Sequence, residues 1–168
     1  MVICLEKAYD RVPRVLLWRV LQEYGIDGQL LVALKSLYEC PSVCVRINGA
    51  KSKPFSVGVG LRQGCVLSPL LFITFMNWID MRSRCGRGIA IGECRISRLI
   101  FADDMVLLSS SEGDLQHALD GFAAECCRAG MKISVAKTET LVLSRKPAQC
   151  VLHVSGATLK QVEKFKYL

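Results

Sequence analysis

The sequence predicts an α+β fold in which helices pack on one face of an antiparallel sheet. Some segments carry apolar residues at helical spacing, whereas others are short β-type runs bounded by turn signals. The two kinds of segment are interspersed without the regular strand–helix alternation of a parallel sheet. The chain has 168 residues, 51% of them hydrophobic. It is therefore expected to form one domain, residues 1–168, with its own core, and not a disordered basic tail.

The first half of the chain is expected to contain three helices and one hairpin. Asp10 and Pro13 open the first helix, Asp27 caps the second, and Ser68 caps the third, with Pro69 at its first position. Asn48-Gly49 is a strong hairpin turn signal. The expected elements, in order, are a strand at 2–5, helices at 10–23 and 29–38, hairpin strands at 43–48 and 53–59, a glycine-rich loop at 58–64, and a long apolar helix at 68–82.

The second half is expected to contain a hairpin, one helix and a tail of short strands. The hairpin strands are placed at 95–102 and 105–109. Ser111 with Asp114 resembles a capping box, and Gly130 follows the end of the helix. The tail, residues 132–168, alternates short strands with turns.

The positive charge of the chain is concentrated in its middle third. The formal net charge is +7, yet acidic and basic residues balance in residues 1–39 and again in residues 103–168. Residues 40–102 contain nine basic and only two acidic side chains. This asymmetry indicates a polyanionic partner, with nucleic acid the first candidate and an acidic membrane surface the rival, while a solvated surface is the plainer alternative.

The nine cysteines and the N-terminus indicate an intracellular protein, in the cytoplasm or nucleus. Charged residues interrupt any early apolar run, so no signal peptide is expected. The odd number of cysteines, with Cys126 and Cys127 adjacent, favours free thiols in a reducing compartment. A zinc site at Cys40 and Cys44 is a competing interpretation, but no second close pair follows. Polar residues interrupt the apolar stretch 66–81, so no membrane span is expected.

Asp103 and Asp104 are adjacent carboxylates between two apolar β-type runs. A plain hairpin turn is the structural alternative, but a tight turn favours Gly or Asn at positive φ, and neither follows the two aspartates. Ionised carboxylates against an apolar hairpin are costly unless they are paired or bind a cation. The pair therefore predicts a site for hard divalent cations of the kind used in phosphoryl transfer.

The glycine-rich loop 58–64 is a second candidate site. Its glycines let the backbone approach a ligand closely, Arg62 and Gln63 supply donors, and a helix N-terminus follows. A plain strand-to-helix connection is the alternative. The basic composition of the surrounding segment favours contact with nucleic acid.

Five motifs, taken together and in order, resemble those of reverse transcriptases. Their residues resemble most those of the LINE-type (non-LTR) retrotransposon polymerases. The resemblance spans nearly the whole chain. The motifs are Leu5-Glu6-Lys7-Ala8-Tyr9-Asp10-Arg11-Val12, the loop and helix start at 60–69, Phe101-Ala102-Asp103-Asp104, Gly130-Met131-Lys132-Ile133 with Ala136-Lys137-Thr138, and Phe165-Lys166-Tyr167-Leu168.

The resemblance implies a polymerase palm, an RNA template, a DNA primer and deoxynucleoside triphosphates as partners, and no membrane. It implies Mg²⁺ as the cofactor, with Mn²⁺ as a substitute. Each implied role belongs to a residue that matches a motif: Asp103 and Asp104 as catalytic metal ligands, Tyr9, Gln63 and Lys137 as nucleotide-binding residues, and Arg62, Gly64 and Lys166 as template or primer contacts.

Two departures from the family pattern predict that this copy is impaired. Cys4 occupies the position of a metal-binding aspartate, and sulfur is a poor ligand for magnesium. Neither nearby carboxylate is expected to replace this ligand, because Asp10 lies six residues further along the chain and Glu6 matches a position that is not a ligand in the family pattern. The chain also lacks most of the fingers and the thumb, which a longer chain would have to supply. The alternative hypotheses are a non-catalytic nucleic-acid-binding remnant and, ranked well below it, a thiol or zinc protein.

Overall fold

The computed structural model describes residues 1–39, 42–84, 86 and 88–165. The chain divides into two compact units, which are described separately: the sheet unit, Met1–Ala8 with Met76–Leu168, and the helical unit, Tyr9–Phe75. None of the helices in the described ranges combines the length and apolarity that a membrane span requires. The seven cysteines that the structure describes all carry free thiols.

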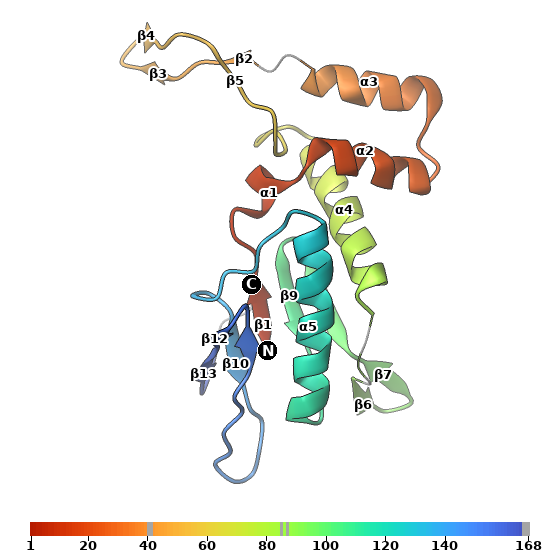
Figure 1. Ribbon diagram of the computed structural model, residues 1–168, viewed down its shortest axis with the longest axis vertical. Helices are drawn as coiled ribbons and strands as arrows, with labels where there is room; N and C mark the ends of the chain where they lie inside the picture. The colour runs from red at the N-terminus through yellow and green to blue at the C-terminus, as the bar shows by residue number, and fades with distance from the viewer. Residues whose placement is uncertain (40–41, 85, 87, 166–168) are drawn as a thin grey trace. The chain divides into compact units, whose positions relative to one another are not determined.

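The sheet unit is built on a five-stranded sheet (Figure 1), in the order β13-β10-β1-β9-β8. All neighbouring strands are antiparallel except β10 and β13, which are parallel. The strands are short: β1 (Val2–Cys4), β8 (Arg98–Phe101), β9 (Asp104–Leu107), β10 (Glu139–Leu141) and β13 (Lys160–Val162).

Helix α5 (Glu112–Arg128) packs on β9 (Figure 1). Its buried side chains include Leu119 and Phe122, and the sheet contributes the fully buried Ile3, Met105 and Leu107 to the core of this unit. The Ser111 hydroxyl accepts a hydrogen bond from the Asp114 backbone N–H at 3.2 Å, so the predicted N-terminal cap is confirmed. The predicted α+β class, with helices on a largely antiparallel sheet, is confirmed as well.

Two further hairpins belong to the sheet unit: β6 (Ile89–Ile91) with β7 (Cys94–Ile96), and β11 (His153–Val154) with β12 (Ala157–Thr158). The prediction of one strand over residues 95–102 is wrong at its start. Arg95 and Ile96 pair with β6 around a two-residue loop that begins with Gly92 at φ 62°. Glycine favours such a loop because it accepts positive φ, and this signal was missed.

The helical unit begins with two helices where the sequence predicted one. Helix α1 (Ala8–Arg11) ends before Pro13, and α2 (Arg14–Glu23) begins after it. Pro13 has an extended backbone as the N-cap of α2. Proline cannot donate the helical hydrogen bond and disfavours helix in the preceding residue, which explains the break. Helix α3 (Gly28–Tyr38) follows close to its predicted bounds, although the Asp27 side chain makes no capping bond.

The hairpin of the helical unit turns at Asn48-Gly49 as predicted, with φ 48° and 86° at the two residues. Its strands are much shorter than predicted: β3 (Arg46–Ile47) pairs with β4 (Ala50–Lys51), and β2 (Ser42–Val43) pairs with β5 (Phe55–Ser56). All eight strand residues are exposed, so packing does not extend the pairing. Helix α4 (Ser68–Arg82) matches its predicted bounds and crosses the boundary between the units along the chain.

Candidate active site

Asp103 and Asp104 lie where β8 turns into β9. Phe101 pairs with Asp104, which leaves Ala102 and Asp103 as a two-residue loop. Asp104 is half-buried at the start of the central strand β9, while Asp103 in the loop is exposed. The hairpin therefore presents two carboxylates from adjacent positions, one anchored in the sheet and one at its tip.

The tight turn forms although the sequence offers neither Gly nor Asn, contrary to the expectation that those residues would be needed. Ala102 adopts φ 52°, in the left-handed region that L-residues other than Gly, Asn and Asp rarely enter. Such a conformation costs on the order of 1–2 kcal/mol and is maintained by the surrounding structure. Here, the pairing of β8 and β9 on both sides of the loop supplies that support.

Cys4 lies directly across from Asp104. The two residues are register partners in the β1–β9 ladder, and the Cys4 thiol donates to Asp104 Oδ1 at 3.8 Å. The Cys4 backbone N–H donates to Thr138 Oγ1 at 3.3 Å, and the Cys4 carbonyl accepts from the Ser134 N–H at 2.8 Å. Burial, the charge of Asp104 and the hydrogen bond to it raise the pKa of the Cys4 thiol above its ordinary value.

Lys137 lies near enough to Cys4 for its charge to act on the thiol. Its positive charge lowers the pKa of Cys4 and so opposes part of the effect of Asp104 and Asp103. Lys137 is exposed, two residues before the start of β10. The sheet unit therefore brings together four of the predicted site residues, namely Cys4, Asp103, Asp104 and Lys137. Glu6 instead forms an ion pair with Lys132, at 3.2 Å between Nζ and Oε2.

The donor set around Asp104 does not match the three-carboxylate pattern that the family resemblance implies. It contains two carboxylates and a thiol, and hard divalent cations prefer oxygen ligands. Within the described part of the chain, no three His, Cys, Asp or Glu side chains are grouped to hold a metal ion. Cys40, one of the two cysteines of the alternative zinc site, lies outside the described residues.

In the helical unit, the glycine-rich loop is bonded to the start of the unit. The Gly60 N–H donates to the Val12 carbonyl at 3.0 Å, and the Leu61 N–H donates to the Tyr9 carbonyl at 2.8 Å. Gln63 Nε2 donates to Asp10 Oδ1 at 3.0 Å. Asp10 is therefore a hydrogen-bond partner of the loop, and its carboxylate positions the side-chain amide of Gln63.

Arg14 is a residue of this unit that the sequence interpretation missed. Its guanidinium donates to the carbonyls of Val57, Val59 and Gly60 at 2.7, 3.2 and 2.9 Å, and to that of Tyr38 at 3.3 Å. It also lies over the Tyr38 ring, 5.0 Å from the centroid. One sequence signal was available, because a cation in the first turn of a helix opposes the helix dipole and so needs another partner.

The remaining predicted site residues lie at separate places in the helical unit, or lie outside the residues that the structure describes. The Tyr9 ring stacks on Phe72, with 4.5 Å between ring centroids and 18° between planes. Arg62 is exposed and lies over the Tyr38 ring at 5.7 Å. Gly64 adopts φ 82° in open space. Lys166 lies outside the described residues.

A model of the family described as reverse transcriptase (RNA-dependent DNA polymerase) matches residues 1–168. The chain is 26% identical over 98% of its length to the Retrovirus-related Pol polyprotein from type-2 retrotransposable element R2DM of Drosophila melanogaster. It is 27% identical over 98% of its length both to the polyprotein from type-1 retrotransposable element R2 of Popillia japonica and to the RNA-directed DNA polymerase from mobile element jockey of Drosophila funebris.

These matches cover 16%, 25% and 18% of the three relatives, so the chain spans a quarter or less of their length. The resemblance drawn from the five motifs is confirmed, because the family model matches the whole chain and the relatives are proteins of retrotransposable or mobile elements.

Proposed function

This chain belongs to the reverse transcriptase (RNA-dependent DNA polymerase) family, and from that premise we propose that it is a palm fragment of an RNA-templated DNA polymerase whose metal site is incomplete. The family acts on nucleic acid and depends on divalent metal ions. For this chain we propose an RNA template, a DNA primer and deoxynucleoside triphosphates as partners, with fingers and thumb supplied by a longer chain. Free thiols fit a reducing compartment, the cytoplasm or nucleus.

Asp103 and Asp104 are the proposed ligands for a divalent cation, Mg²⁺ or in its place Mn²⁺. When bound, such a cation neutralises the charge of the reacting phosphates. The protein's own contribution is positioning. Lys137 is proposed to attract the pyrophosphate, and the Tyr9 ring, backed by Phe72, to contact the nucleotide sugar.

The glycine-rich loop is the proposed support for the template side of the site. Gln63, held by Asp10, is proposed to support the template–nucleotide pair. Arg62 and Gly64, on the exposed part of the same loop, are proposed to contact template or primer, as is Lys166.

The proposal of impaired activity depends on one observation, the contact between Cys4 and Asp104. At this position a carboxylate would add a third hard ligand and a negative charge, whereas the thiol offers a soft, protonated donor at 3.8 Å from Asp104 Oδ1. The backbone of Cys4 is bonded on both sides, so a change of side chain is expected to leave the strand in place. The defect is therefore expected to be one of donor chemistry, and a single substitution should address it.

The experiment is primer extension on an RNA template with Mg²⁺ or Mn²⁺, with the unmodified chain compared with Cys4→Asp. We expect Cys4→Asp to extend the primer at least tenfold faster, Cys4→Ser to give no gain, and Cys4→Asp combined with Asp104→Asn to lose the gain. Cys4→Ser is the matched control because it changes the thiol without adding a carboxylate. Extension by the unmodified chain as fast as by Cys4→Asp would contradict the proposal.

Metal binding gives a second measurement that does not require fingers or thumb. Titration of Mn²⁺ followed by electron paramagnetic resonance is expected to show at least tenfold tighter binding by Cys4→Asp than by the unmodified chain or Cys4→Ser. Equal Mn²⁺ affinity for all three would reject the proposed role of position 4, even if none of them extends a primer.

A non-catalytic nucleic-acid-binding remnant is the second candidate function. The concentration of positive charge in residues 40–102 favours it independently of the metal site. The affinity of the unmodified chain for a primer–template duplex is expected to fall steeply with salt. An affinity that does not change with salt concentration would count against nucleic-acid binding as the function.

A further inference from the structure

A cavity of about 580 Å³ lies in the sheet unit, between the end of α4 and the strands β7 and β8. Among its described lining residues three are arginines and one, Asp80, is acidic; we call it the arginine cavity, and define it by Asp80, Arg84, Arg95 and Arg98. Of the three arginines, Arg98 has a buried side chain, whereas Arg84 and Arg95 are exposed. The cavity is distinct from the Asp103–Asp104 turn.

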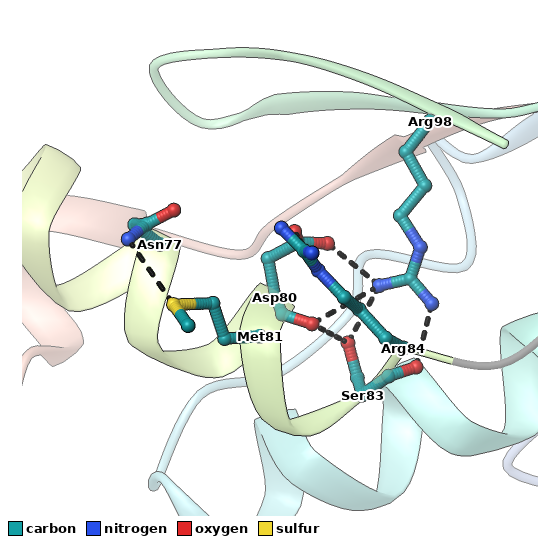
Figure 2. A network of polar contacts seen from close by, with 6 residues as sticks. All are labelled: Asn77, Asp80, Met81, Ser83, Arg84 and Arg98. Atoms are coloured by element: carbon teal, nitrogen blue, oxygen red, sulfur yellow. Dashed lines mark hydrogen bonds and ion pairs between the residues drawn. The ribbon is translucent and has the colours of Figure 1, made fainter. Parts of the chain in front are cut away.

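Arg98, which lines the arginine cavity, is joined to Asp80 and Ser83 by hydrogen bonds and an ion pair (Figure 2). Its side chain is only 6% exposed, and it donates to Asp80 Oδ1 at 2.6 Å, to Ser83 Oγ at 2.8 Å and to the Ser83 carbonyl at 2.5 Å. It also donates to the Asp80 carbonyl at 3.4 Å. Arg98 thus joins β8 to the C-terminal carbonyls of α4, and its charge is matched by that of Asp80.

Arg84 and Arg95 form the exposed part of the lining. The Arg84 side chain is 69% exposed, and its Nε lies 3.7 Å from Asp80 Oδ2, a contact much longer than that of Arg98. Arg95 is exposed on β7. The described lining therefore contains three guanidinium groups and one carboxylate, a formal excess of two positive charges in a concave site. Such clusters focus the electrostatic field and attract anions.

Strand register places the arginine cavity on the opposite side of the sheet from Cys4 and Asp104. Arg98 pairs with Leu107, and Ile100, which also lines the cavity, pairs with Met105. Leu107 and Met105 are fully buried. Because successive side chains alternate between faces, Arg98 and Ile100 share the face opposite to that of Asp104. A ligand in the cavity would therefore approach a different face from the one that carries the candidate metal ligands.

We propose that the arginine cavity is a second nucleic-acid site, which binds phosphodiester groups through Arg84 and Arg95, with Arg98 as a positioning residue. The guanidinium fork matches two oxygens of a phosphate, which makes arginine the preferred side chain for this recognition. A concave site suits a projecting phosphate better than a flat lipid surface. The site does not depend on the proposed polymerase activity, because it shares no side chain with the Cys4–Asp104 pair.

The test is binding of a fluorescein-labelled single-stranded RNA of twenty nucleotides, measured by fluorescence anisotropy over a range of salt concentrations. For Arg84→Gln combined with Arg95→Gln, we expect affinity at low salt to fall about tenfold and the slope of log K against log salt to become shallower by about 1.4, as the loss of two phosphate contacts requires. Arg84→Lys combined with Arg95→Lys is expected to keep the slope.

The matched control is Arg145→Gln combined with Lys146→Gln, which removes the same charge from an exposed loop of the same unit. It is expected to change affinity less than threefold and to leave the slope unchanged. Arg84→Gln alone is expected to produce about half of the slope change, and thermal unfolding by circular dichroism checks that every variant is folded.

Equal losses in the double variant and the control would overturn the proposal, as would an unchanged slope. Binding to vesicles that contain phosphatidylserine is also measured for each variant, to test whether the cavity binds a membrane instead of RNA. If the double variant lost vesicle binding and kept RNA binding, a membrane site would replace the nucleic-acid site. This RNA-binding measurement requires neither a divalent metal ion nor primer extension, so failure of the catalytic proposal would not be mistaken for failure of this one.

Discussion

The Cys4–Asp104 pair of the sheet unit and the glycine-rich loop of the helical unit are held in place in different ways. The pair is positioned by backbone register, since β1 and β9 are hydrogen-bonded neighbours in a sheet. Among the described residues, the loop has two backbone bonds to the start of its unit, and the side chain of Arg14 donates to two of its carbonyls and to that of Val57 just before it.

This difference decides what a substitution does in each region. At position 4, the proposed ligand chemistry depends on the side chain, whereas the strand register depends on backbone hydrogen bonds. The conformation of the loop backbone depends on Gly60 and on the bonds that Arg14 of α2 donates to the loop carbonyls, so a change at either residue removes part of this support. We therefore expect substitutions in the loop to affect stability strongly, and substitutions at position 4 to affect metal binding with little effect on stability.

Gly60→Ala is expected to have the largest effect, a loss of about 3–4 kcal/mol in the free energy of unfolding. Gly60 has φ +80°, and an added Cβ would lie 2.7 Å from the Asp10 carbonyl oxygen. Gly64→Ala is the matched control, because it has φ +82° with nothing within 4 Å, and it should cost only about 1 kcal/mol of backbone strain. Urea denaturation measures both. Equal losses would show that contact with Asp10 is unimportant.

Arg14→Met is expected to cost about 2–3 kcal/mol, because it keeps much of the side chain's bulk and removes every donor to the loop carbonyls. Arg19→Met on the exposed side of α2 is the control and should change stability by less than about 0.5 kcal/mol. Protease cleavage within residues 57–64 should also become faster in Arg14→Met. A stable variant with an intact loop would show that the two backbone bonds suffice.

Thr138→Val and Thr140→Val are expected to have opposite signs. Thr138 is fully buried, and its hydroxyl bonds the Cys4 N–H and the Ser134 carbonyl, so its loss should cost about 1–2 kcal/mol. Thr140 is equally buried, but its hydroxyl has no hydrogen-bond partner among the described residues, so valine should be neutral or stabilising by up to about 1 kcal/mol. Urea denaturation distinguishes the two. Losses in both variants would show that the difference in hydrogen bonding does not determine stability here.

The sequence predicted the hairpin at Asp103–Asp104 well because its evidence is local. Asp103 and Asp104 are adjacent in a motif, and the apolar runs on both sides define the strands that pair. Arg14 was missed because its acceptors in the loop lie more than forty residues further along the chain, and no local pattern records them. The early strand start at Arg95 was an error of another kind, because the Gly92 turn that pairs Arg95 with β6 is a local signal present in the sequence.

Cys4→Asp is expected to have a small effect on stability and the clearest dependence on metal. Without metal, a carboxylate directly across from Asp104 adds like-charge repulsion, and unfolding should become easier by up to about 1 kcal/mol in EDTA. Mn²⁺ should reverse this loss by binding the folded state, whereas Cys4→Ser should respond to neither condition. Thermal unfolding with EDTA and with Mn²⁺ measures the difference. If Cys4→Asp were instead as unstable as Gly60→Ala and metal did not restore it, register alone would not hold this site, and the contrast between the two regions would fail.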